Sequence, residues 1–277
     1  MKNAAAKPET KKEAAKRDQV DRQPADAITL KASIADPLID GVLTRYGLTV
    51  DSDAPRHIYF FDTPDLTLLK AGIIARARRI SGDDHDSTVK FHPVVAADIP
   101  AMWRECDGFQ LERDLSETGA ITSASLTVPV SKGAIKQVAA GEKGIAKLFS
   151  KEQEAFLTAV GGPGIAYEGL CVLGPVAGHC WTLTDPAYPW RITAELWQRE
   201  DGTRLMEVAI KAPLIQAEVA SAGFMVFMQT VGAQRHMKPQ TKTRWILRHY
   251  VKAAPAESAT VNPSDKAEVN RDQESHQ

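Results

Sequence analysis

Charged side chains recur at alternate positions in seven segments of this sequence, and most of these segments have the alternating or β-branched character of strands. Alternate side chains of a strand lie on the same face of a sheet. Each segment is therefore expected to present one charged and one apolar face. In chain order the charged faces supply Lys31; Arg76 and Arg78; Lys90; Glu112 and Asp114; Glu195; Glu207; and Lys242 with Arg244.

These faces could do chemistry if they were turned inward. A wet tunnel lined by cations and carboxylates is suited to a metal-assisted polyphosphate site, because lysine and arginine bind phosphate oxygens. Carboxylates would hold a hard divalent ion that bridges those oxygens and a water molecule. For any single strand, an outer face in contact with solvent is an equally good interpretation. The recurrence across seven segments favours the tunnel.

The elements that must position these residues can be read from the apolar pattern and the turn residues. An Asp-Gly turn at 201–202 predicts a hairpin between the last two strands before residue 213. The pattern predicts helices at 36–46 with Asp36 as N-cap, at 65–70, twice within 131–160 and at 213–235. It predicts strands at 27–32, 57–62, 73–80, 86–92, 109–115, 168–173, 179–185, 190–199 and 203–211, with 242–250 closing the domain as a further charged segment.

The order of these elements predicts an α+β fold, in which an antiparallel β-barrel or tunnel is surrounded by helices. The chain has 277 residues and is 43% hydrophobic, which is enough for a real core. Residues 1–26 and 253–277 are poor in apolar side chains, so we expect two disordered tails around one domain at 27–252.

Composition excludes several classes of protein. Three cysteines cannot form a disulfide scaffold, and they lack zinc-ligand spacing. The net charge of −1 gives no support for bulk nucleic-acid binding. The basic start is not followed by an apolar segment, so we expect a cytoplasmic protein. The apolar stretch at 214–233 is interrupted by Glu218, and we expect a buried helix there rather than a membrane span. A homodimer formed through that helix or a barrel edge is one further expectation.

The segment YFFDTPDLTLLKAGIIARAR at 59–78 resembles the Y-F-D-T stretch and following R-x-R of the CYTH family, the triphosphate tunnel metalloenzymes. Members of that family include thiamine triphosphatases, inorganic triphosphatases and class IV adenylate cyclases. The T-x-K at 88–90, the acidic strand around Glu112, the hairpin with Glu195 and Glu207, and the terminal Lys242 follow in the family's order. The resemblance covers roughly residues 27–250 and implies a CYTH-like tunnel.

The resemblance implies a role for each of the charged residues. The implied phosphate ligands are Lys31, Arg76, Arg78, Lys90, Lys242 and Arg244. The implied ligands of Mg²⁺ or Mn²⁺ are Glu112, Asp114, Glu195 and Glu207, with Glu112 and Glu207 as catalytic residues. The ligand is expected to be a small-molecule triphosphate or inorganic polyphosphate.

The sequence departs from the family at its acidic positions. The family's N-terminal E-x-E-x-K is replaced by Ala27-Ile28-Thr29-Leu30-Lys31, and the late E-x-E by Glu207-Val208-Ala209. The loss of three carboxylates removes much of the negative charge that would hold a divalent ion. Phosphate binding survives this loss better than metal catalysis does.

Four hypotheses follow. The first is a metal-dependent triphosphatase, in which water attacks the terminal phosphoryl group. The second is a non-catalytic module that binds phosphorylated ligands, and the third is an adenylate cyclase of the class IV type. The last is a structural protein whose barrel is filled by side chains. We expect Trp197 to be a core residue rather than a platform for a nucleobase.

Overall fold

A computed structural model of the chain describes residues 27–50, 56–81, 85–116, 119–185, 188–231 and 241–253. The two tails predicted at 1–26 and 253–277 lie outside this range, apart from residue 253. Within the described residues, no helix is long and apolar enough to cross a membrane.

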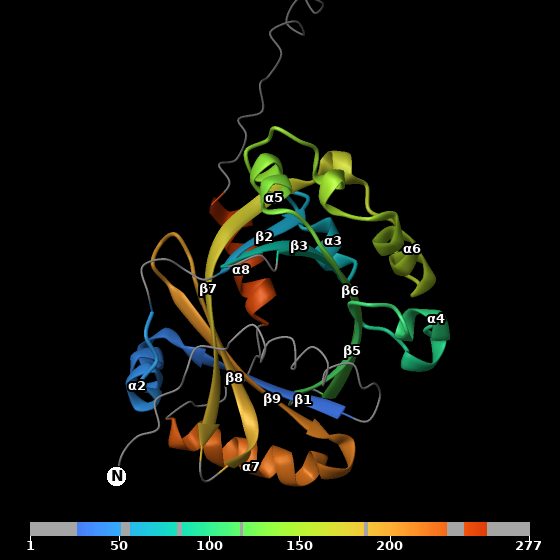
Figure 1. The fold of residues 1–277 in the computed structure, drawn as a ribbon. Helices are drawn as coiled ribbons and strands as arrows, with labels where there is room; N and C mark the ends of the chain where they lie inside the picture. Colours follow the sequence, from blue (N-terminus) through green and yellow to red (C-terminus); the bar gives the residue numbers. More distant parts are fainter. Residues whose placement is uncertain are drawn as a thin grey trace, which may run out of the picture.

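Nine strands close into one barrel in the order β1-β5-β6-β4-β3-β2-β7-β8-β9 (Figure 1). Every neighbouring pair is antiparallel except β1 and β5, which are parallel. This confirms the predicted α+β barrel with surrounding helices and adds one parallel pair to it. The strands are β1 Ala27–Ala35, β2 Arg56–Asp62, β3 Ile73–Ile80, β4 Asp86–Phe91, β5 Phe109–Ser116, β6 Gly119–Pro129, β7 Cys171–Asp185, β8 Tyr188–Gln198 and β9 Arg204–Pro213.

Helices cover the barrel on several sides (Figure 1). The α-helices are α2 Asp36–Tyr46, α3 Thr67–Lys70, α4 Ala101–Arg104, α5 Lys132–Ala139, α6 Lys151–Ala159, α7 Ala217–Thr230 and α8 Lys242–Ala253. Short 3₁₀ turns lie at η1 Ala96–Asp98, η2 Ile145–Leu148, η3 Tyr167–Gly169 and η4 Leu214–Gln216.

The apolar faces of the strands form two cores outside the barrel wall. In the first, α2 and α7 pack on β1, β8 and β9, with Ile28, Val208 and Phe224 buried between them. In the second, α4, α5 and α6 cover β3, β4 and β6, with Val89 and Phe156 at its centre. Because the apolar faces point outward to these helices, the opposite, polar faces of the same strands must line the inside of the barrel.

Helix α8 lies inside the ring of strands (Figure 1). Its Ile246 and Leu247 are buried against Ile58, Phe60 and Trp197, which lie on the inner faces of β2 and β8. One side of the barrel interior is therefore filled by apolar side chains. The charged residues of the interior adjoin this apolar part, since the Trp197 indole donates a hydrogen bond to Glu195.

Four sequence predictions need correction. Residues 242–250 form a helix, not a strand. Strand β6 was not predicted. The two strands predicted at 168–173 and 179–185 are one strand, β7, in which Gly174-Pro175 lies at a register shift rather than a turn. The N-cap of α2 is Ala35, because the Asp36 carboxylate bonds to Arg204 instead of the helix start.

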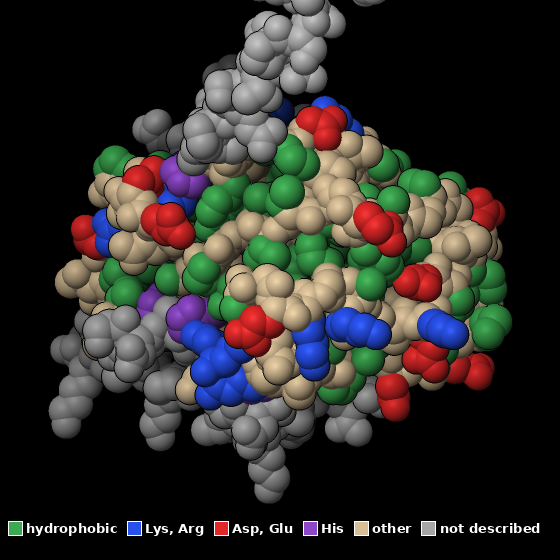
Figure 2. Space-filling view, turned by 90° about the horizontal axis from the view of Figure 1, so that it is seen from above, with side chains coloured by type: hydrophobic (Ala, Val, Ile, Leu, Met, Phe, Trp, Pro, Cys, Tyr) green, Lys and Arg blue, Asp and Glu red, His purple; other side chains and the backbone are tan. Residues whose placement is uncertain are grey.

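The outer surface has no large field of one sign on the face seen from above, where acidic, basic and apolar side chains are mixed (Figure 2).

Candidate functional site in the barrel interior

The strand register brings the predicted charged residues to a common interior. In antiparallel pairs, side chains of directly opposed residues lie on the same face. Glu195 on β8 is opposite Glu207 on β9, and Arg78 on β3 is opposite Asp86 on β4. The inward orientation of these faces follows from the outward orientation of their apolar neighbours. The predicted alternation is therefore correct for six of the seven segments.

Cations and carboxylates pair across neighbouring strands of this interior. Each pair joins an amine or guanidinium nitrogen to a carboxylate oxygen within hydrogen-bond distance, and the side chains involved are mostly shielded from solvent. The pairs are Lys31 with Asp114 at 2.9 Å, Lys90 with Glu112 at 2.6 Å, and Arg78 with Asp86 at 2.6 Å.

A fourth group is centred on Lys242, which α8 carries into the interior. Its Nζ contacts one oxygen of Glu207 at 3.1 Å and an oxygen of Glu195. The second oxygen of Glu195 accepts a 3.0 Å hydrogen bond from the Trp197 indole and lies 3.9 Å from Arg56. Trp197 is fully buried, which confirms it as a core residue.

Arg76 is the exception among these interior cations. It lies on the inner face of β3, opposite Thr88 of β4. Its Nε is buried with no hydrogen-bond partner among the described residues. Burial and the nearby Arg78 lower the pKa of Arg76 to about 10, so the guanidinium is still charged at neutral pH. A buried, charged and unpartnered donor is suited to an anion.

The paired groups stay ionised because their partners outweigh the cost of burial. Lys90 and Lys31 hold the pKa of Glu112 well below its ordinary value. Burial would lower the pKa of Lys31 and Lys242, but the surrounding carboxylates raise both above the ordinary lysine value. Burial would raise the pKa of Glu195, yet Lys242 and Arg56 lower it. These four side chains therefore keep their charges inside the barrel.

Arg244 differs from the other predicted phosphate ligands. It lies on α8, two residues and about half a turn from Lys242, and its side chain is exposed. Residues two apart on a helix do not share a face, so the predicted alignment of Lys242 with Arg244 is wrong. Arg244 is nevertheless near enough to His92 to contribute, after burial and Lys90, to lowering the pKa of that imidazole.

Two solved structures share this arrangement of strands and helices. A protein from Bacillus halodurans named as a candidate adenylate cyclase superposes with a TM-score of 0.52 at 13% identity, over 79% of this chain and 97% of that chain. A candidate adenylyl cyclase from Hippeastrum, described as having a dominant triphosphatase activity, gives a TM-score of 0.54 at 14% identity, over 81% and 96%. This is a CYTH-type tunnel fold. Neither a protein-family model nor a curated protein sequence matches the chain.

The CYTH-type tunnel brings together nine of the ten predicted site residues. Eight of them lie on inner strand faces, and Lys242 reaches the interior from α8. Two further residues of the network were not predicted, namely Arg56 and Asp86. Both could have been found by extending the alternation, since Asp86 precedes Thr88 and Lys90 at the same spacing and Arg56 precedes Ile58.

The carboxylates of this tunnel do not fit a divalent ion as they are arranged. Among the described residues, no group of three histidine, cysteine, aspartate or glutamate side chains could hold a metal. Glu112, Asp114, Glu195 and Glu207 each contact a lysine. Their roles as ligands of Mg²⁺ or Mn²⁺, and the catalytic roles of Glu112 and Glu207, stay predictions from the resemblance.

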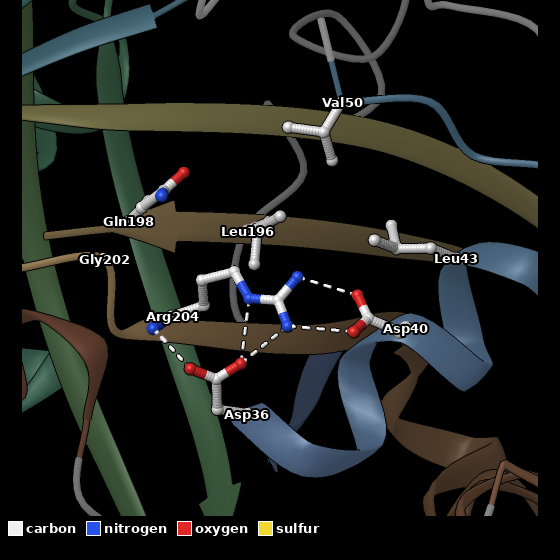
Figure 3. A pocket seen from close by; sticks show the side chains of 8 residues that line it. All are labelled: Asp36, Asp40, Leu43, Val50, Leu196, Gln198, Gly202 and Arg204. Carbon is white, nitrogen blue, oxygen red and sulfur yellow. Dashed lines mark hydrogen bonds and ion pairs between the residues drawn. The ribbon is translucent and has the colours of Figure 1, made fainter. Parts of the chain in front are cut away.

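A separate cavity of about 550 Å³ lies outside the barrel wall (Figure 3). Its charged groups satisfy one another, because Arg204 donates to Asp36 at 2.8 Å and to Asp40 at 2.7 Å. These bonds fasten α2 to β9. The cavity is lined by Asp36, Asp40, Leu43, Val50, Leu196, Gln198, Gly202 and Arg204.

Proposed function

We propose that the tunnel binds a phosphoryl-bearing anion of the triphosphate class, either a small-molecule triphosphate or inorganic polyphosphate. The observation that carries this proposal is the buried Nε of Arg76, which has no hydrogen-bond partner among the described residues and lies in an interior where Lys31, Arg78, Lys90 and Lys242 are also directed inward. A linear triphosphate presents oxygens at several points along its length, which matches cations distributed over different strands.

The paired carboxylates give the site its shape before a ligand arrives. Lys90 and Lys31 are held in place by Glu112 and Asp114, so they lose little side-chain freedom when an anion binds. Arg76 would bind phosphate oxygens without first breaking an ion pair. The neighbouring ammonium groups would then share their protons between carboxylate and phosphate.

Hydrolysis of the ligand is a second candidate function. The structural relative from Hippeastrum is described as a triphosphatase, and the fold is shared. Catalysis by a bound metal would need carboxylates that are free of lysine, and the tunnel does not offer them in this arrangement. Binding is therefore the function that the geometry supports best. Cyclisation of ATP has no separate support in the described residues.

Calorimetric titration of the full chain with inorganic triphosphate, ATP and thiamine triphosphate tests the proposal. Arg76→Ala is expected to weaken binding by about 1.5–3 kcal/mol, because a charge-assisted hydrogen bond is lost from a buried site. That is about 10- to 150-fold in affinity. Arg79→Ala is the matched control, because Arg79 is on the same strand but on the opposite face.

A thermal-shift series complements the titration. A ligand at about 100 times its dissociation constant should add roughly 2.7 kcal/mol of stability. Release of phosphate or formation of cyclic AMP, measured in the same samples, would separate a triphosphatase or a cyclase from a binding protein. An unchanged melting temperature with all three ligands would mean that the interior is only a filled structural core.

A further inference from the structure

The repulsion between the facing carboxylates of Glu195 and Glu207 is offset by a lysine that contacts both. These two glutamates are directly opposite each other on β8 and β9. Like charges in that position destabilise a sheet. Their side chains are only 19% and 13% exposed, so solvent screens the repulsion poorly. A cation between the two carboxylates offsets this repulsion.

Lys242 supplies that cation. Its Nζ contacts carboxylate oxygens of both Glu195 and Glu207, and it also lies 5.0 Å from the centre of the Trp197 ring. Lys242 is at the first position of α8, the end of a helix where a positive charge is least favourable. The two carboxylates and the aromatic face therefore account for its position better than the helix itself does.

Both carboxylate oxygens of Glu195 have partners in the protein. Its Oε1 accepts a hydrogen bond from Trp197 and faces Arg56, while its Oε2 faces Lys242. A carboxylate with both oxygens held by donors of the protein has little left to offer a metal ion.

We propose that the Lys242 ammonium takes the position between Glu195 and Glu207 that a divalent ion would otherwise occupy, so that the tunnel binds its ligand as the metal-free phosphoryl anion. This inference deepens the proposed function, since it names the form of the ligand. The charges of Glu195 and Glu207 are then neutralised by Lys242 itself, without Mg²⁺ or Mn²⁺.

The first experiment titrates the full-length protein with inorganic triphosphate, once with EDTA and once with excess Mg²⁺. Binding is expected in EDTA, with affinity equal to or tighter than in Mg²⁺, because complexation by Mg²⁺ removes charge from the anion. Binding that requires Mg²⁺ would overturn the inference while supporting the proposed function. Absence of binding in both buffers would contradict the proposed function, and the second experiment would then decide the inference.

The second experiment titrates Mn²⁺ alone and follows the signal of the free ion by electron paramagnetic resonance. Lys242→Met removes the ammonium and leaves an unbranched apolar side chain that is one atom shorter. The variant is expected to bind Mn²⁺ at least about tenfold more tightly than the natural protein, because two facing carboxylates are left without a cation. Equal binding by the two proteins would overturn the inference.

Two further variants make this test specific. Lys242→Met combined with Glu195→Gln should lose the acquired Mn²⁺ binding, because one of the two carboxylates is gone. Lys70→Met breaks an exposed ion pair with Asp65 outside the barrel and should leave Mn²⁺ binding as in the natural protein. Circular dichroism confirms folding of each variant. The EDTA titration needs no variant, so the inference is tested even if Lys242→Met fails to fold.

Discussion

Glu112 shows at the scale of one residue how the tunnel network couples stability to pH. Lys90 lies 2.6 Å from its carboxylate and, together with Lys31, holds the pKa of Glu112 well below the ordinary value of 4.5. In the unfolded chain this carboxyl takes up a proton near its ordinary pKa. Below that pH the unfolded state binds more protons than the folded state, so acid favours unfolding.

We therefore expect the stability contributed by Glu112 to be complete above about pH 4.5 and to be lost as the pH falls toward its folded-state pKa. Glu112→Gln should flatten the dependence of the melting temperature on pH between about pH 3 and 5. Thermal melts in a pH series measure this. The exposed Glu142 offers a control, since Glu142→Gln should leave the slope unchanged.

The residues of the tunnel were largely predictable, because alternation in strands is a local property. Lys31, Arg76, Lys90, Glu112 and Glu207 all lie on the predicted face. The partner of each residue was not predictable, because partners are fixed by register between strands far apart in sequence. The pairing of Lys31 with Asp114 depends on the parallel contact of β1 with β5, which no local pattern indicates.

At the scale of elements, the Y-F-D-T stretch has a structural explanation. The Asp62 carboxylate is 1% exposed and accepts hydrogen bonds from the backbone N–H groups of Thr63, Leu68 and Leu69. Two of these donors belong to the short helix α3, whose first N–H groups have no partner within the helix. Asp62 therefore fixes α3 at the end of β2. The next element in the chain is β3, which carries Arg76 and Arg78.

Asp62→Ala is expected to destabilise the protein by about 2–3 kcal/mol, because three backbone N–H groups, one in a buried and two in partly buried hydrogen bonds, lose their carboxylate acceptor at once. Urea unfolding followed by tryptophan fluorescence measures this as a lower midpoint with an unchanged slope. Asp65→Ala removes a nearby carboxylate that is 67% exposed and should cost much less. A similar loss for both variants would contradict the buried capping role of Asp62.

The sequence pattern fails for two elements, for different physical reasons. It does not indicate β6, and it gives the start of α8 the alternation of a strand. Strand β6 has small residues on its inner face, Ser123, Ser125 and Thr127, so it lacks a strong apolar alternation. It is a strand because β4 and β5 pair with its two edges. Helix α8 begins with alternating Lys242 and Arg244, and its helical character appears only when Ile246, Leu247 and the residues beyond are included.

At the scale of the whole molecule, one surface is more apolar than the rest. Nine large hydrophobic side chains of the described residues are exposed, and five of them lie between Leu214 and Val226. Figure 1 shows α7 on the outside of the barrel, with only one side against the strands. The sole charge on α7 is Glu218. A neutral apolar stripe is compatible with a copy of itself, because an antiparallel pair centred on Ala222 would keep the two Glu218 carboxylates apart.

The stripe on α7 predicts self-association of the chain. Val226→Asp should shift the protein toward the monomer, because the charge would be buried between the two helices. Analytical ultracentrifugation at micromolar concentrations measures this. Val95→Asp is a matched control, because Val95 is 64% exposed and Val226 is 63% exposed, but Val95 lies away from α7. A natural protein that sediments as a monomer throughout would rule out the pairing.

The barrel can close only late in the synthesis of the chain, because its first strand pairs with its last. Strand β1 is the first to be made, yet its partners are β5 and β9, and Ala27 pairs with Pro213 at the end of β9. Pairings between such distant segments form slowly. A nascent chain carries β1 without its β9 neighbour until nearly all of the domain has left the ribosome. The barrel interior that gathers the cations is therefore closed only after the last strand, β9, has been translated.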